Sequence, residues 1–225
     1  MNPFIETGDL HLLKGHHVYL QFLTEAHREV LRPLARDERI WEYTKAFLIN
    51  ETFHQQFDKY FDEALSLATR GDQAFAIVAT DGNRVVGMTR AYDLDRRAKK
   101  ITIGFTWYVP EVWGKAHNKE CKLLLLTYMF EGLGLQRVDF KVAGQNIRSQ
   151  KAVEKIGGVR EGVLRRYTLR NDGTPADTVF FSILGEEWPE KKERLLSEGW
   201  GVRGLSAEAS AWTNGRSRPT RNFVI

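Results

Sequence analysis

The residues with the clearest chemical potential lie where a predicted buried strand (100–109) leads through a short loop into a long predicted helix (115–133). Residues 112–118 at this junction read VWGKAHN and are mostly small or polar. A helix start leaves about four backbone N–H groups unpaired and carries a partial positive charge, which together suit a phosphate or pyrophosphate. Lys115 would add a charge-assisted contact to such an anion. An ordinary buried crossover between two strands has the same pattern, so this segment alone leaves both interpretations open.

A second group of polar residues follows the next predicted strand, 136–143. Asn146 and Ser149 form an Asn-x-x-Ser pattern at the start of a short predicted helix, which Gly157 and Gly158 end. The plainest role for this pair is a helix cap, with Asn146 at the N-cap and Ser149 three residues later. A capping role and a ligand-binding role are compatible for Asn146, because different atoms of its side chain can serve the two roles.

Cysteine and histidine usage argues against disulfides and against a metal site. Cys121 is the single cysteine, so no internal disulfide can form, and we expect it to be a buried small residue rather than a nucleophile. The six histidines are scattered, and no His-x-x-x-His pair with a nearby acid predicts a zinc site. No apolar run approaches the roughly 20 residues that cross a bilayer, and the N-terminal segment lacks a signal pattern. The expected location is cytoplasmic, with no membrane partner.

The formal net charge of +4 is concentrated toward the C-terminal end. Residues 199–225 contain four arginines against one glutamate, which leaves about +1 for residues 1–198. A nearly neutral body does not support a nucleic-acid-binding face built on bulk charge. We therefore expect no nucleic-acid partner.

These segments must be positioned by a fold that alternates strands and helices. Phenylalanines at 53, 57 and 61 recur at helical spacing in 52–70, a helix that Gly71 ends, and residues 81–83 (Asp-Gly-Asn) predict a hairpin turn. The order β-α-α-β-β-β-α-β-α-β-β predicts an α+β fold whose mixed sheet carries helices on both faces. Strands are predicted at 17–23, 74–80, 84–92, 100–109, 136–143, 159–169 and 177–184, and helices at 24–36, 52–70, 115–133, 146–156 and 186–198.

The chain is expected to form one domain with two appendages. Residues 1–14 read as an N-terminal extension and residues 15–198 as the folded domain. Residues 199–225 shift to Gly, Ser, Ala and Arg with little periodicity. We interpret this last segment as lying outside the fold, either flexible or artificial in origin.

Residues 142–167 combine Asn-x-x-Ser, Glu-Lys-x-Gly-Gly and Glu-Gly-x-Leu in one order. Together with the preceding strand, loop and helix, this segment resembles the GNAT superfamily of acyl-CoA-dependent N-acyltransferases, in the RimJ/RimL-type branch of ribosomal-protein N-terminal acetyltransferases. The resemblance covers about residues 15–190 and is strongest over 100–184. It implies a mostly antiparallel mixed sheet of about seven strands with a splayed parallel pair. It also implies acetyl-CoA as co-substrate and a primary amine as acceptor, and a homodimer is a further family expectation.

The family's pyrophosphate loop, Arg/Gln-x-x-Gly-x-Gly/Ala, falls on Trp113, Ala116 and Asn118, and this chain departs from the pattern at all three. Backbone amides do most of the binding in this family, so Gly114 and the small Ala116 keep the site feasible. The resemblance also implies that the acyl arm adds to the exposed edge of the preceding strand, where a backbone N–H faces the thioester oxygen. For the side chains of Trp107 and Tyr108, packing in the core is the alternative to a cofactor contact, and it stays open. Expected cofactor contacts are Trp107, Tyr108, Val109, Gly114, Lys115, Ala116, His117, Asn118, Lys119 and Asn146.

In this branch the Asn-x-x-Ser pair lies beside the cofactor thiol, so Ser149 and Asn146 are the expected catalytic residues, with Ser149 protonating the departing thiolate. A carboxylate base is missing from the two places where RimL-type proteins often carry one, which fall here on Thr102 and on Tyr167 or Thr168. We therefore expect direct attack by a neutral amine in a ternary complex, with a water path for the proton. A peptide α-amine is partly neutral at pH 7, whereas a lysine side chain is not. The remaining base candidates are Asp177, Asp93, Asp95 and His117.

Two other functions stay open from the sequence. A non-catalytic acyl-CoA-binding module would account for the altered loop and the missing carboxylate. A detoxifying acetyltransferase would act by the same chemistry on a small-molecule amine. For an acetyltransferase acting on either a peptide or a small molecule, the acceptor pocket is expected from the helices within 24–70 and the 164–177 hairpin. Candidate wall residues are Arg32, Trp41, Tyr43 and Tyr167.

Overall fold

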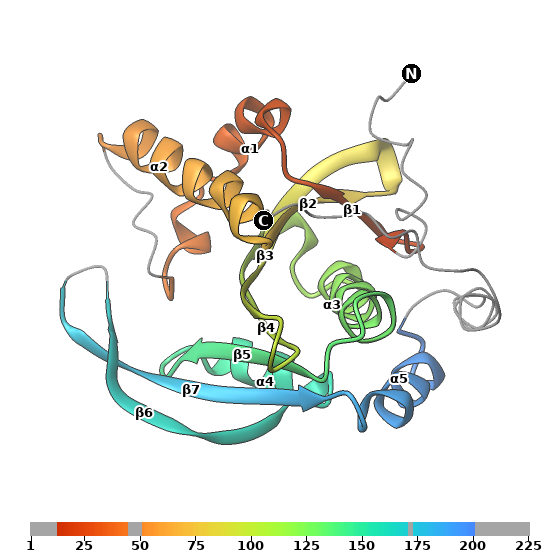
Figure 1. Cartoon of the computed structure of the whole chain (residues 1–225). Helices are drawn as coiled ribbons and strands as arrows, with labels where there is room; N and C mark the ends of the chain where they lie inside the picture. Colours follow the sequence, from red (N-terminus) through yellow and green to blue (C-terminus); the bar gives the residue numbers. More distant parts are fainter. Residues whose placement is uncertain (1–12, 45–50, 171–172, 201–225) are drawn as a thin grey trace.

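The computed structural model describes residues 13–44, 51–170 and 173–200, within which seven β-strands form one sheet (Figure 1). Their order across the sheet is β1-β2-β3-β4-β5-β7-β6, and every neighbouring pair is antiparallel except β4 and β5. The expected α+β class and mostly antiparallel pairing are confirmed. The strands are β1 (Val18–Phe22), β2 (Gln73–Ala79), β3 (Arg84–Asp95), β4 (Lys100–Tyr108), β5 (Arg137–Ala143), β6 (Val159–Leu169) and β7 (Pro175–Leu184).

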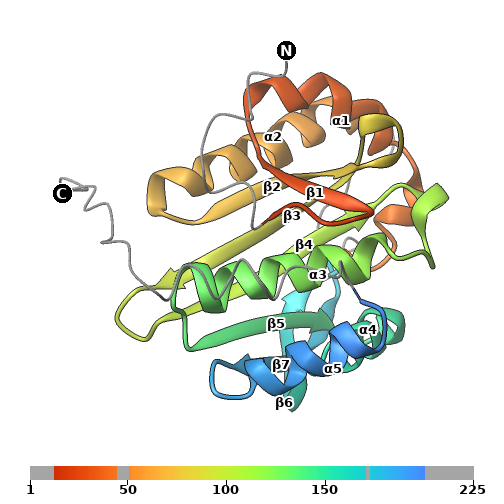
Figure 2. The ribbon, with the colours of Figure 1, turned by 90° about the vertical axis from the view of Figure 1, so that its right-hand side faces the viewer.

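Helices cover both faces of the sheet. Helices α1 and α2 contribute to one buried hydrophobic cluster, whereas α3, α4 and α5 contribute to another. In Figure 2, α3 crosses in front of the sheet with α5 below it, while α1 and α2 lie above. The helices of the described residues are α1 (Arg28–Leu34), α2 (Phe53–Ser66), α3 (His117–Thr127), α4 (Ile147–Lys155) and α5 (Trp188–Ser197), and a π-helical turn (Tyr128–Gly132) extends α3.

The two clusters lie on opposite sides of the sheet because successive side chains of a strand alternate faces. On β2, Phe75 and Ile77 pack in the cluster of α3, whereas Ala74 packs in the cluster of α1 and α2. Met88 of β3 packs in the same cluster as Ala74. The sheet is therefore the middle layer of three.

Local signals in the sequence predict the helix and hairpin of the N-terminal half correctly. Phe53, Phe57 and Phe61 are buried on one face of α2, and Gly71 follows with a φ of +81°. The turn between β2 and β3 uses Gly82 at a φ of +71°, a conformation that glycine adopts without strain. Residues 171 and 172, between β6 and β7, lie outside the described residues.

Helix α3 is enclosed on all sides. Every residue from 120 to 127 is buried, including Cys121, whose thiol is free as expected. A helix that is buried all round needs neighbours on each side, and α3 contacts both β1 of the sheet and α5. Burial raises the pKa of the Cys121 thiol, which fits a packing role rather than that of a nucleophile.

The parallel strands β4 and β5 separate soon after they begin. Their pairing is confined to residues 100–102 of β4 and 137–139 of β5. Further along β4, Phe105 has a φ of +48°, and the register with β3 shifts between Met88 and Arg90. Such a bulge bends a strand away from its neighbour. The splayed parallel pair that the resemblance implies is therefore present.

Packing reaches both ends of the described region. Leu13 and Trp200 are buried in the cluster of α3. The remainder of the predicted N-terminal extension (1–12) and of the C-terminal appendage (201–225) lies outside the described residues. In the parts that the structure describes, no helix is long and apolar enough to cross a membrane.

Candidate active site

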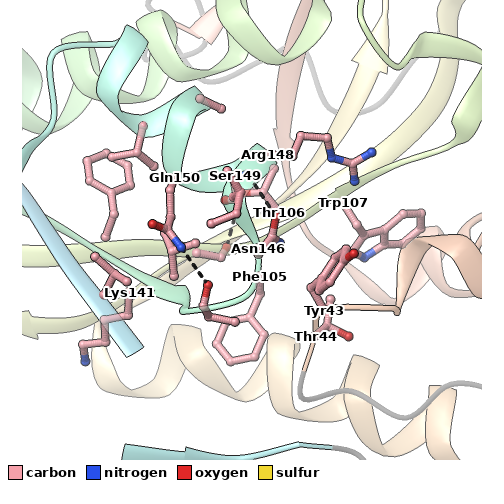
Figure 3. Close-up of a pocket in the computed structure, with 18 of the residues that line it drawn as sticks. Tyr43, Thr44, Phe105, Thr106, Trp107, Lys141, Asn146, Arg148, Ser149 and Gln150 are labelled. Atoms are coloured by element: carbon pink, nitrogen blue, oxygen red, sulfur yellow. Dashed lines mark hydrogen bonds between the residues drawn. The ribbon is translucent and has the colours of Figure 1, made fainter. Parts of the chain in front are cut away.

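A cleft of about 1400 Å³ opens where β4 and β5 separate (Figure 3). Its walls come from the end of β4, the start of α3, the end of β5, α4 and the β6–β7 hairpin. Of the residues predicted from the sequence to contact the cofactor or to act in catalysis, Val109, Ala116 and His117 do not line it. Those that do are Trp107, Tyr108, Gly114, Lys115, Asn118, Lys119, Asn146 and Ser149.

The start of α3 is open toward ligands. Ala116 is the N-cap residue, and within the described residues no side chain caps this helix end. Gly114 has a φ of +72°, and nothing lies within 4 Å of the point where a Cβ would stand. The need for glycine at 114 is therefore one of backbone conformation and not of space. Lys115 and Lys119 add two cations beside these amides.

His117 lies on the side of α3 that faces the N-terminal strand. Its ring is 6.2 Å from the ring of His17, and its buried Nδ1 has no hydrogen-bond partner among the described residues. Burial, and next the proximity of His17, lower the pKa of His117. Because the ring does not line the cleft, this residue is poorly placed for either cofactor binding or proton transfer there.

Glu120, one turn into α3, fixes the helix start in a way that the sequence analysis missed. The carboxylate is buried and accepts hydrogen bonds from the backbone N–H groups of His16, His17 and Val18, at 2.7, 2.6 and 2.8 Å. A Cβ on Gly15 would collide with it. This carboxylate therefore fastens the entry to β1 onto α3.

The exposed edge of β4 is only partly free. The N–H of Val109 donates to the carbonyl of Val86 on β3, at 2.9 Å, so this group is unavailable to a ligand. The carbonyl of Tyr108 accepts a hydrogen bond of 2.8 Å from the indole Nε1 of Trp113. The side chains of Trp107 and Tyr108 are both buried and pack in different clusters, as the core-packing alternative predicts.

Asn146 and Ser149 meet at the start of α4. The Asn146 side chain accepts a hydrogen bond of 2.9 Å from the backbone N–H of Ser149, which makes Asn146 the N-cap. The side chain of Gln150 donates to the carbonyls of Ala143 and Gly144 and holds the preceding turn. Figure 3 shows Asn146 and Ser149 together at the cleft. The capping role is thus real, and it places the serine at the wall of the cleft.

An aromatic wall faces α4 across the cleft. Trp41, Tyr43 and Tyr167 line the cleft as expected, and the Trp41 ring lies 5.6 Å from that of Trp107. Figure 3 shows the side chain of Arg148 extending from α4 toward the side of the cleft where Tyr43 and Trp107 lie. The Arg148 guanidinium stacks 4.7 Å from the Trp113 ring.

Arg32, the fourth predicted wall residue, belongs to a different structure. It forms ion pairs of 2.8 Å with Glu29 and with Asp58, and it stacks on Phe57. Arg32 therefore joins α1 to α2 and does not line the cleft.

Positive charge dominates the lining of the cleft. Nine basic side chains face two carboxylates, which favours anionic groups and disfavours an acceptor that carries several positive charges. The basic residues are Arg39, Lys115, Lys119, Lys122, Lys141, Arg148, Lys155, Arg160 and Arg170, and the carboxylates are Glu42 and Asp177.

The carboxylates suggested as bases are already engaged. Asp177 accepts a hydrogen bond from the backbone N–H of Arg166, Asp93 forms a 2.7 Å ion pair with Lys141, and Asp95 accepts from the N–H of Ala98. Asp93 and Asp95 do not line the cleft. Within the described residues, no group of three or more histidine, cysteine or acidic side chains could hold a metal ion.

Comparison with known proteins agrees with this geometry. Residues 17–159 match the family described as the acetyltransferase (GNAT) domain. YdaF of Bacillus subtilis, provisionally named a ribosomal N-acetyltransferase, is 36% identical over 112 residues, which are 50% of this chain and 60% of YdaF. The chain thus spans about three fifths of the length of the curated relatives it matches.

Solved structures extend the likeness to the whole fold. A protein from T. thermophilus, provisionally named an acetyltransferase, is 34% identical with a TM-score of 0.73, covering 83% of this chain and 95% of that one. Mycobacterium smegmatis RimJ, solved with CoA-disulfide, shares 19% identity with a TM-score of 0.71, covering 82% of this chain and 90% of that one, and shows likeness of fold. Because the GNAT match covers well over half of its residues, the chain belongs to the GNAT family of acetyltransferases.

Proposed function

We propose that this protein transfers the acetyl group of acetyl-CoA to a primary amine, with a peptide α-amine as the preferred acceptor. One observation carries the proposal: the uncapped start of α3 lies beside the gap between β4 and β5. An anion-binding helix end and a slot for an extended arm are the two features that a coenzyme A thioester requires.

The backbone amides after Gly114 would bind the diphosphate, with Lys115 and Lys119 adding charge. Fixed N–H groups cost no reorganisation when an anion binds, which is why the departures at Trp113, Ala116 and Asn118 leave the site usable. The gap along β4 would take the thioester arm. This assignment is supported by Gly114, Lys115 and Lys119, which all line the same cleft.

Ser149 would supply a proton at the end of the reaction. The acceptor nitrogen bonds to the thioester carbonyl carbon and loses a proton, the carbon–sulfur bond breaks, and the thiolate accepts the hydroxyl proton of Ser149, which a proton from solvent replaces. The cap made by Asn146 holds this serine at the cleft wall. An oriented proton donor of this kind contributes typically 100-fold or more to a rate.

The charge of the cleft supports the choice of acceptor. Polyamines and lysine-rich segments would meet an excess of cations, whereas an α-amine brings a single positive charge or none. A small-molecule acceptor with an anionic group would fit the same electrostatics, so both acceptor types belong in the test.

The experiment measures binding and turnover separately. Calorimetry should show saturable binding of acetyl-CoA to the full chain, and mass spectrometry should show acetylation of peptides with a free α-amine faster than of the same peptides with only a lysine amine. Binding without turnover on any amine would replace the enzyme with a non-catalytic module. A preference for the lysine amine would refute the proposed acceptor.

A further inference from the structure

Lys122 is a buried amine inside the cleft. It lies in the enclosed part of α3, only 9% of its surface is exposed, and it nevertheless contributes to the cleft lining. A lysine at such a position is unusual, because lysine side chains are almost never fully buried without a partner. The feature calls for a role that a leucine at this place could not fill.

The partners of the amine are hydroxyl groups. The Nζ of Lys122 donates to the Oγ1 of Thr106 at 2.7 Å, and this oxygen lies 2.7 Å from the Oγ1 of Thr89. Thr106 follows the bulge at Phe105, so it lies where β4 turns away from β5. Figure 3 shows Thr106 at the same part of the cleft as Asn146 and Ser149.

Among the described residues, Lys122 has no ion pair, and its surroundings do not offer one. The other ionisable groups on α3, β4 and β5 are His117, Lys119, Glu120, Cys121, Lys100, Tyr108, Arg137, Asp139 and Lys141. The carboxylate of Glu120 is engaged by the backbone N–H groups of His16, His17 and Val18. Asp139 and Lys141 alternate with buried apolar residues of β5 and so lie on the opposite face of that strand. The β5 residues that face the α3 cluster are Val138, Phe140 and Val142.

Burial lowers the pKa of Lys122, and Cys121 opposes this shift to a smaller degree. Desolvation favours the neutral amine because no ion pair compensates an ammonium charge here. A neutral amine that donates one N–H to Thr106 keeps its lone pair. It can therefore accept a proton from a group that enters the cleft.

We propose that Lys122 is the general base of acetyl transfer, accepting the proton that the acceptor nitrogen loses as it bonds to the thioester carbonyl carbon. The proposal rests on the proposed function and supplies the base that the carboxylates cannot. The protons balance: one leaves the acceptor nitrogen for Lys122, the thiolate takes one from Ser149, and Ser149 regains a proton from solvent in the cleft. Lys122 then releases its proton to solvent through the open cleft.

The test compares Lys122→Arg and Lys122→Met with the wild type. Arginine keeps a donor for Thr106 but cannot deprotonate, and methionine removes the charge and the base at similar volume. The matched control is Lys59→Arg on the exposed face of α2, outside the cleft. Steady-state kcat and KM are measured for a peptide α-amine across pH, alongside acetyl-CoA binding by calorimetry and thermal unfolding.

In the wild type, two ionisations should shape the acidic limb of kcat/KM, because both the acceptor and Lys122 must be neutral. Both Lys122 variants should lose about 100-fold in kcat, typical for a general base, and retain one ionisation, that of the acceptor. Acetyl-CoA binding should be retained, and K122M should unfold no earlier than the wild type. Lys59→Arg should match the wild type throughout.

Three outcomes separate this proposal from the proposed function. If the wild type acetylates the peptide and K122R keeps both its rate and its pH profile, Lys122 is not the base, and the acetyltransferase activity stands. If K122M is fully active, the proposal is refuted in the same way. A wild type that binds acetyl-CoA but acetylates no amine would instead overturn the proposed function.

Discussion

The indole Nε1 of Trp113 donates a hydrogen bond of 2.8 Å to the carbonyl oxygen of Tyr108, so the loop before α3 is fastened to the end of β4. Trp113 stands at a place where the family pattern has arginine or glutamine, whose charge or amide could contact a phosphate directly. Here the side chain instead contacts the protein, and Arg148 stacks on its outer face. The loop is therefore held in shape by an internal bond.

Trp113→Phe should weaken acetyl-CoA binding and leave the chemistry nearly unchanged. The ring and its stacking with Arg148 remain, but the bond to Tyr108 is lost, worth about 0.5–1.5 kcal/mol. We expect the dissociation constant for acetyl-CoA, measured by calorimetry, to rise by about 2- to 10-fold with kcat within about twofold. An unchanged dissociation constant would mean that the bond does not shape the loop.

Gly114→Ala should disturb the cofactor loop through the backbone alone. At a φ of +72° an alanine is strained by about 1–2 kcal/mol, although the space for its Cβ is empty. Gly82→Ala is the matched control, because Gly82 has a φ of +71°, the same empty surroundings and no place in the cleft. Both variants should lose similar stability in urea unfolding, and only G114A should lose acetyl-CoA affinity, by about tenfold. Equal binding by both variants would exclude the loop as the diphosphate site.

Glu120→Gln should destabilise the fold rather than impair a chemical step. The amide can accept through one oxygen, but its NH₂ group would face backbone donors that now bond to a carboxylate. Because hydrogen bonds to a buried charge are strong, we expect a loss of about 2 kcal/mol or more in the free energy of unfolding. Urea denaturation measures this loss, and a stability equal to that of the wild type would show that the contact is dispensable.

The sequence predicts local structure well because its causes are local. The spacing of Phe53, Phe57 and Phe61 determines the buried face of α2, and Asp-Gly-Asn at 81–83 specifies the hairpin. No local sequence pattern of comparable strength predicts the separation of β4 from β5. It was expected only through the family resemblance, since the bulge at Phe105 depends on its pairing with β3.

The two buried ionisable residues of α3 show what the sequence alone could not predict. Glu120 and Lys122 lie in the first two turns of α3, among polar residues, and exposure is the ordinary interpretation of such residues. The signal that could have located them is the following apolar run, Leu123 to Leu126. It covers a full turn and therefore indicates a helix enclosed on all sides. The partners of Glu120 and Lys122 depend on the packing of β1 and β4 and could not be predicted.

Stability should fall as the medium becomes acidic because of His27. Burial lowers the pKa of this histidine below its ordinary value of about 6.5, and a bond to the backbone of Thr24 opposes the shift. The unfolded chain then binds more protons than the folded protein over this pH range. The stability contributed by the neutral His27 is therefore fully present above the pKa of the unfolded state and is lost as pH falls through the pKa of the folded state. Urea unfolding at a series of pH values from about 8 to about 5 should show the decline.

A His27→Gln variant should show a smaller decline than the wild type over the same range. It should not be flat, because the pKa of His117 is lowered in the same direction. If the stability of the variant declined with pH as steeply as that of the wild type, His27 would not cause the acid sensitivity, and other groups would.

Substitutions at Asn146 and Ser149 distinguish the effect of the helix cap on stability from the effect of the serine hydroxyl on the reaction. Asn146→Ala removes the side chain that accepts the N–H of Ser149, and loss of such a cap costs about 1 kcal/mol. Ser149→Ala keeps that backbone N–H and its bond to Asn146, so its thermal unfolding should match the wild type. If the hydroxyl protonates the leaving thiolate, S149A should lose about 100-fold in kcat with little change in KM for either substrate.

Asn146→Asp supplies the control, since aspartate caps a helix as well as asparagine does. It should restore the stability that the alanine variant loses. Steady-state kinetics on a peptide α-amine decides the role of the serine. An S149A enzyme with the wild-type kcat would show that the hydroxyl is not the proton donor and that the Asn-x-x-Ser pair serves the helix alone.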